Sequence, residues 1–175
     1  MMNSEWNLVE ALRHARHDWM NRLQLIKGNM DLGRMDRAGQ IIEEIVAEAQ
    51  NESKLSNLRV PKFAELMLTY NWQTHFIKIE FEVLQAEEPE IDDDRVYQWF
   101  TEFFSIMENS VKPYEENNLV VTIKICQNDA RFELDFNGII IDRENLQNWL
   151  ELQDSTITLH TLDNEGFLIS LSLNT

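Results

Sequence analysis

The side chains best suited to chemistry stand on one predicted helix near the N-terminus of this chain. His17 is preceded by Arg16 and followed by Asp18. At about 100° per residue, His17 falls about 160° from the centre of an apolar stripe on the same helix, so its ring is predicted to face solvent. Arg13 and Asn21 lie one turn before and after it. An exposed imidazole on a rigid helix suits a nucleophile that must meet a phosphoryl group carried by another protein.

The apolar stripe of this helix is a packing seam, because its residues recur at spacings of three and four. They are Leu8, Leu12, Ala15, Trp19, Leu23, Ile26 and Met30. The helix is predicted from about residue 5 to about 33, where Gly33 ends it and Asp36 caps the next helix. The second helix runs to about Leu58 and places Ala38, Ile41, Ile42, Ile45 and Ala49 on one side. A lone hairpin leaves these seams in water, so we expect a second copy to close a four-helix bundle.

A mixed domain follows, which divides the chain into residues 1–60 and 61–175. Pro61 suits the first turn of a new helix, and Asp92-Asp93-Asp94 opens a longer one whose apolar residues form core. Period-two alternation predicts strands at 77–83, 119–126, 131–136, 156–162 and 167–173, with a short helix near 142–150. The fold class is therefore α+β, with a helical hairpin followed by a two-layer α/β sandwich.

Composition limits the setting and the partners. The net charge is −16, and residues 61–175 hold seven basic against twenty-two acidic side chains, which disfavours nucleic acid and anionic membranes as partners. Apolar runs long enough to span a bilayer are absent and the N-terminus lacks a signal-peptide pattern, so a cytoplasmic location is expected. The single cysteine, Cys126, lies in an apolar run and is interpreted as a buried structural thiol.

The residues around His17 carry a family resemblance. The positions Arg16-His17-Asp18, Asn21, Leu23, Ile26 and Gly28 match the phosphoacceptor pattern of two-component sensor histidine kinases. The runs 17–29 and 52–58 resemble the sporulation initiation phosphotransferase family of spore-forming bacteria. The resemblance is strong over residues 10 to 60 and, beyond them, rests mostly on the order of elements.

This resemblance implies a homodimeric four-helix bundle, an appended domain shaped like a degenerate kinase ATPase domain, and phosphoryl relay between two response regulators. His17 is the predicted phosphoacceptor. The other predicted catalytic residues are Arg16, Asn21 and Asp18, and the predicted partner-binding residues are Arg13, His14 and Gln24. Arg13 and Arg16 offset phosphoryl charge and Asn21 orients the ring, while Mg²⁺ is expected from the partner regulator rather than from a cofactor site of this chain.

Three alternatives stay open. An ATP-dependent histidine kinase needs glycine-rich loops, and this chain has five glycines, of which only Gly138 and Gly166 follow the hairpin. The segment 135–139 resembles a damaged nucleotide-binding turn, and Asn109 resembles a magnesium-binding asparagine. A docking scaffold that is never phosphorylated is the second alternative. A metal held by His14 and His17 is the third, although two ligands do not make a site. His75, at the start of a strand, and His160, inside another, are interpreted as structural or surface residues.

Overall fold

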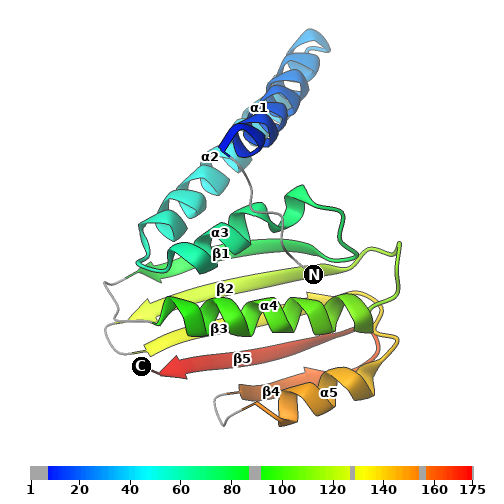
Figure 1. Ribbon diagram of the computed structural model, residues 1–175. Coiled ribbons are helices and arrows are strands. Elements are labelled where there is room, and N and C mark those ends of the chain that lie inside the picture. Colours follow the sequence, from blue (N-terminus) through cyan, green and yellow to red (C-terminus); the bar gives the residue numbers. More distant parts are fainter. Residues whose placement is uncertain (1–7, 87–91, 127–128, 154–156, 175) are drawn as a thin grey trace. The chain divides into compact units, whose positions relative to one another are not determined.

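We describe the protein from a computed structural model covering residues 8–86, 92–126, 129–153 and 157–174. The chain divides into two compact units, residues 1–50 and residues 51–175. Figure 1 shows the helices and strands of both units.

The first unit is a helical hairpin. Helix α1 spans Leu8–Asp31 and helix α2 begins at Met35 and continues to Asn57 in the second unit. Gly33 makes the turn with φ 71°, a left-handed conformation that glycine adopts without a Cβ clash. An ion pair between Arg22 and Glu48 joins the two helices. The predicted hairpin and the role of Gly33 are confirmed.

The second unit is built on a five-stranded mixed sheet in the order β1-β2-β3-β5-β4. Strand β1 pairs parallel to β2, and the other neighbours pair antiparallel. The strands are β1 Lys78–Ala86, β2 Asn118–Cys126, β3 Asp129–Asn137, β4 Ile157–Leu162 and β5 Gly166–Asn174. Alternate side chains of β1, β2, β3 and β5 are buried, as period-two patterning predicts, whereas none of the β4 side chains is buried.

Helices cover one face of this sheet (Figure 1). They are α3 Pro61–Thr69, continued by the 3₁₀ turn η1 Tyr70–Trp72, then α4 Asp93–Ser110 and α5 Arg143–Glu151. The core between the layers is rich in aromatic rings: Phe63 lies 4.8 Å from Phe100 and 5.6 Å from Phe132, measured between ring centroids. The residues that helical spacing predicts as core are all buried, so the α+β two-layer sandwich is confirmed: Val96, Phe100, Phe103, Phe104, Met107 and Val111.

Two local predictions are wrong. Asp36 does not cap α2, because the helix already begins at Met35 and Asp36 lies inside its first turn, where its charge still favours the helix dipole. His75 does not begin a strand, because β1 starts at Lys78 and His75 lies in the preceding loop. The predicted helix start near residue 5, the strand start at Thr156 and the side chain of Cys126 lie outside the described residues.

Candidate functional site

The His17 ring stands on the exposed surface of α1, with 73% of its side chain accessible to solvent. Its Nδ1 lies 3.2 Å from the side-chain nitrogen of Asn21 and 3.5 Å from a carboxylate oxygen of Asp18. Asn21 reaches it because residues four apart lie above one another on a helix. Two of the predicted neighbours therefore contact the same ring nitrogen.

The remaining predicted residues lie close by without touching the ring. Arg13, Arg16 and Gln24 are exposed on α1, and none of them forms a hydrogen bond or ion pair with His17 in the described structure. His14 is half-buried. The two arginines and Gln24 are thus available to a partner molecule, while Asn21 and Asp18 hold the ring.

The apolar seam of α1 is open to solvent in the single chain. None of the described α1 residues is buried, and Trp19, at the middle of the seam, is 53% exposed. On α2, Ala38 and Ile41 are buried, whereas Ile42 and Val46 are about half exposed. The hairpin therefore buries one narrow interface internally and leaves most of its apolar surface in water.

In the second unit, the acid next to Asn109 is already engaged. Glu108 accepts hydrogen bonds from the Tyr70 hydroxyl at 2.8 Å and from the Phe76 backbone N–H at 3.1 Å. The His75 ring stacks on Tyr70 at 3.9 Å, and its Nδ1 lies 3.6 Å from Glu108. Burial lowers the pKa of His75, and the Glu108 charge opposes this shift. Burial, with the adjacent Glu108 charge, raises the pKa of Tyr70.

Asn109 itself points away from that cluster, since it is exposed and donates to the backbone oxygen of Ser105, one turn back, at 2.7 Å. His160, the other histidine of this unit, lies on β4 with its Nε2 2.7 Å from the Ser170 hydroxyl on β5. These contacts fix the side chains of Asn109 and His160 to other residues of the second unit. Both histidines of the second unit thus have structural partners.

Gly138 lies where neighbouring side chains leave no room for a Cβ. A Cβ at this position would stand 2.4 Å from Oδ1 of Asn117 and 2.7 Å from the ring of Phe136. The buried Asn117 side chain donates to the backbone oxygens of Phe76 and Lys112 and accepts from the Ile139 N–H. Gly138 is therefore required by packing against Asn117. Sequence reasoning missed Asn117, because an asparagine before a strand has the ordinary signature of a turn residue.

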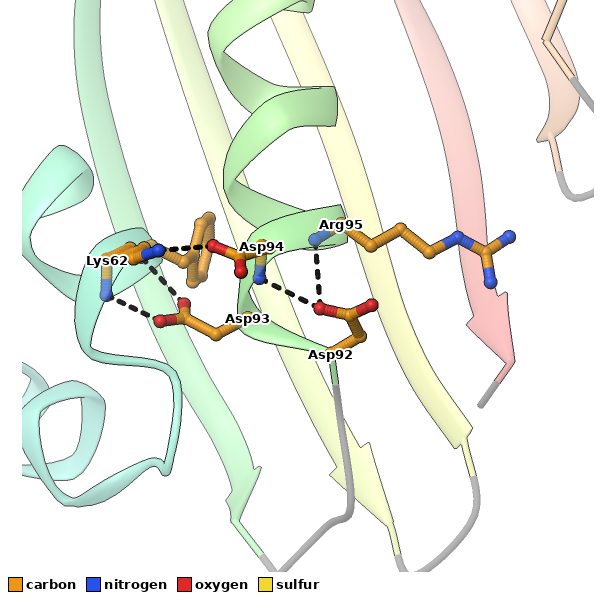
Figure 2. Close-up of polar contacts among 6 residues, drawn as sticks. Lys62, Asp92, Asp93, Asp94 and Arg95 are labelled. Carbon is orange, nitrogen blue, oxygen red and sulfur yellow. Dashed lines mark hydrogen bonds and ion pairs between the residues drawn. The ribbon is translucent and has the colours of Figure 1, made fainter.

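The three consecutive aspartates before α4 have separate roles (Figure 2). Asp92 caps α4 by accepting from the backbone N–H groups of Asp94 and Arg95. Asp93 accepts from the N–H groups of Lys62 and Phe63, in the first turn of α3. Asp94 forms an ion pair with Lys62, which raises the pKa of that lysine. Hydrogen bonding and ion pairing thus account for all three carboxylates.

The described residues provide neither a metal-binding cluster nor a membrane-spanning helix. A group of three or more histidine, cysteine or acidic side chains able to hold a metal ion is not found among those residues. Likewise, within the same ranges, no helix combines the length and the apolar character needed to cross a membrane.

Comparisons with known proteins assign this chain to a family. Residues 1–58 match the model of the α-helical domain of SpoOB-type sensor kinases. Residues 59–174 match the C-terminal domain of sporulation initiation phosphotransferase B. The chain is 37% identical over 163 residues to sporulation initiation phosphotransferase B of Bacillus subtilis strain 168, covering 87% of this chain and 85% of that one. The chain belongs to this family and is a phosphotransferase.

Solved structures with similar folds were also found. The histidine kinase AdeS of Acinetobacter baumannii is 9% identical, with a TM-score of 0.44 over 90% of this chain and 97% of that one. A structure described as a bacterial phosphotransferase is 11% identical, with a TM-score of 0.38 over 97% and 98% of the two chains. The family assignment rests on the sequence matches.

Proposed function

We propose that this phosphotransferase relays a phosphoryl group between two response regulators through His17. The observation that carries the proposal is the exposed His17 ring, whose Nδ1 is held by Asn21 and Asp18 on a helix of the family's helical domain. When Nδ1 carries the ring proton, this N–H can donate a hydrogen bond to the Asp18 carboxylate, and Nε2 keeps its lone pair for attack. A 180° turn of the Asn21 amide presents its oxygen to the same proton.

The transfer balances without a further reactant. The Nε2 lone pair forms a bond to the phosphorus of an aspartyl phosphate, the bond from phosphorus to the aspartate oxygen breaks, and the regulator recovers a free carboxylate. The reverse step delivers the phosphoryl group to the aspartate of the second regulator. Arg13 and Arg16 contribute positive charge near the transferred group, and His14 and Gln24 contact the regulator. We expect Mg²⁺ to be supplied by the acidic pocket of the regulator and this chain to hold no cofactor of its own.

The active form is proposed to be a homodimer. Beyond the seam of α1, α2 carries a second row of small and apolar side chains at spacings of four and three: Met35, Gly39, Ile42, Val46 and Ala49. Val46 is 49% exposed and Gly39 has no atom within 4 Å of a Cβ position. Two hairpins related by a two-fold axis bury both rows and form a four-helix bundle. We also propose that residues 1–60 form the dimerisation and phosphoacceptor domain and that the protein is cytoplasmic.

Transfer of label from a phosphorylated regulator tests the relay. The protein is mixed with a radiophosphorylated response regulator, and then with a second regulator. We expect acid-labile, base-stable label on the wild-type chain and its passage to the second regulator. His17→Gln should remain unlabelled, whereas the matched control His14→Gln, which changes only a proposed regulator contact, should still acquire label and retain most of the transfer.

A parallel reaction with γ-labelled ATP and no regulator extends this experiment to the alternatives. A docking scaffold would bind regulators and acquire no label, and a kinase would acquire label on His17 from the γ-phosphate of ATP. Loss of activity in His14→Gln equal to that in His17→Gln would show that the nucleophile is wrongly assigned.

A further inference from the structure

Asn137 ends strand β3 and is followed by Gly138, and this is the only Asn-Gly pair in the sequence. In such a pair the backbone nitrogen of the glycine can attack the side-chain amide of the asparagine and close a five-membered ring. Glycine permits the attack because it has no Cβ and its backbone is flexible. The Asn137 side chain is exposed, and among the described residues it has no hydrogen-bond partner. Its amide is therefore open to attack.

In the folded chain, however, the attacking nitrogen is already engaged. The Gly138 N–H donates to the backbone oxygen of Glu165 at 2.9 Å, and the Ile140 N–H donates to that of Asn164 at 2.9 Å. Asn137 itself is paired on both sides, with β2 and with β5. The Gly138 nitrogen must leave its hydrogen bond before it can lose its proton and attack, so the reaction requires a local opening of the fold.

The Glu165 oxygen comes from the turn between β4 and β5, and the Asp163 carboxylate holds this turn. Its Oδ1 accepts from the Glu165 N–H at 2.8 Å and from the Gly166 N–H at 3.0 Å. An aspartate that accepts from the backbone two and three residues further on fixes a turn in one conformation. The hydrogen bond at Gly138 therefore depends on the side chain of Asp163.

We propose that Asn137 is a site of spontaneous deamidation, which the turn between β4 and β5 suppresses in the folded protein. The Gly138 nitrogen forms a bond to Cγ of Asn137, while its proton and the side-chain amide nitrogen leave as ammonia. Water then opens the ring at either carbonyl and yields aspartate or isoaspartate. The site belongs to the second unit and is independent of the relay through His17.

The isoaspartate product does not fit the fold at this position. In isoaspartate the main chain runs through the former side chain, so it is longer by a methylene group. Gly138 has no room to shift, because a Cβ there would stand 2.4 Å from Oδ1 of Asn117. The same oxygen accepts from the Ile139 N–H at 3.0 Å. A longer chain at residue 137 displaces Gly138 and Ile139 from these contacts and thereby destabilises the second unit.

Incubation of the purified protein near neutral pH tests the site. Trypsin releases the peptide 132–143, whose only side-chain amide is that of Asn137, so mass spectrometry assigns its deamidation to this residue. In guanidinium chloride, Asn137 should deamidate faster than Asn145, Asn148 and Asn164, which are followed by residues with side chains. In the native protein it should react roughly tenfold or more slowly than in denaturant, because the reaction waits for local opening. Equal rates in the native and unfolded protein would overturn the proposal.

Variants of the turn test how the fold suppresses the reaction. Asp163→Ala should raise the native deamidation rate roughly threefold to tenfold, whereas Asp163→Asn keeps an acceptor oxygen and should stay near the wild-type rate. Glu165→Ala is the matched control, because only backbone groups of Glu165 take part in these bonds. Asn137→Ser should abolish both the deamidation and the fall, with incubation time, in the midpoint of urea unfolding. An unchanged rate in Asp163→Ala, or an equal fall in Asn137→Ser, would refute the proposal.

Discussion

At the scale of single residues, solvent exposure separates the histidines of this chain. The His17 side chain is 73% exposed, whereas that of His75 is 13% exposed and lies between Tyr70 and Glu108. An exposed ring is free to meet a partner, while a buried ring contributes to the fold in its neutral form. Solvent exposure therefore agrees with the proposal that His17 is the phosphoacceptor and with a structural role for His75.

The neutral state of His75 predicts a pH dependence of stability. Because its folded pKa lies below the ordinary 6.5, the unfolded chain takes up a proton first as pH falls. The contribution of the neutral His75 ring to the free energy of unfolding is complete above about pH 6.5 and is lost as pH falls through the lower folded pKa. His75→Phe keeps the ring stacking and removes the titration. Its unfolding free energy, from urea melts, should fall less steeply than that of the wild type between about pH 7.5 and about pH 5.5; equal slopes would contradict this account.

At the scale of elements, Asp93 links two helices that are far apart in sequence. Its carboxylate accepts from the Lys62 and Phe63 N–H groups at 2.9 and 3.0 Å and thereby caps α3 from the start of α4 (Figure 2). Asp93→Ala should lower the unfolding free energy of the second unit by about 1–2 kcal/mol, the usual cost of a lost cap. Urea unfolding measures this, and Asp94→Ala is the control. It removes only an exposed ion pair and should lower the unfolding free energy clearly less than Asp93→Ala does. An equal loss of unfolding free energy in both variants would show that the Asp93 cap contributes no more than the exposed ion pair.

Two glycines make a matched pair at the same scale. Gly138→Ala places a methyl group 2.4 Å from the Asn117 side chain and should destabilise the second unit by roughly 1–3 kcal/mol. Gly28 lies inside α1 and has no atom within 4 Å of its Cβ position. Gly28→Ala should therefore raise the unfolding free energy of the hairpin by up to about 1 kcal/mol. Calorimetry of both variants checks the opposite signs, and a stabilising Gly138→Ala would refute the packing argument.

At the scale of the whole molecule, the exposed rows of the hairpin predict a dimer. Trp19→Glu and Val46→Glu place charges in the proposed bundle core, where they are costly when unpaired. Both variants should shift the mass in solution from dimer to monomer, measured by light scattering at micromolar concentration. Leu152→Glu is the control, because Leu152 is exposed outside the hairpin and should leave the dimer intact. A wild-type monomer with full helical content would contradict the bundle.

The sequence by itself determined the elements and their faces. The spacing of apolar residues predicted the hairpin, the core of α4 and the strands, because local periodicity reports directly which side of each element is buried. The same geometry placed His17 opposite the seam, and the structure has its ring exposed. Asp36 was assigned wrongly as a cap because an acidic residue is common both at the N-cap position and within the first turn of a helix.

The tertiary structure decided how distant residues meet. Asp93 caps α3 over a separation of thirty residues, Asn117 fills the space that makes Gly138 necessary, and Asn51 reaches the edge of β1 from α2. No local pattern encodes such contacts, because they depend on the positions of elements packed from separate parts of the chain. The type of a polar residue shows that it can form a hydrogen bond, and only the folded chain determines its partner.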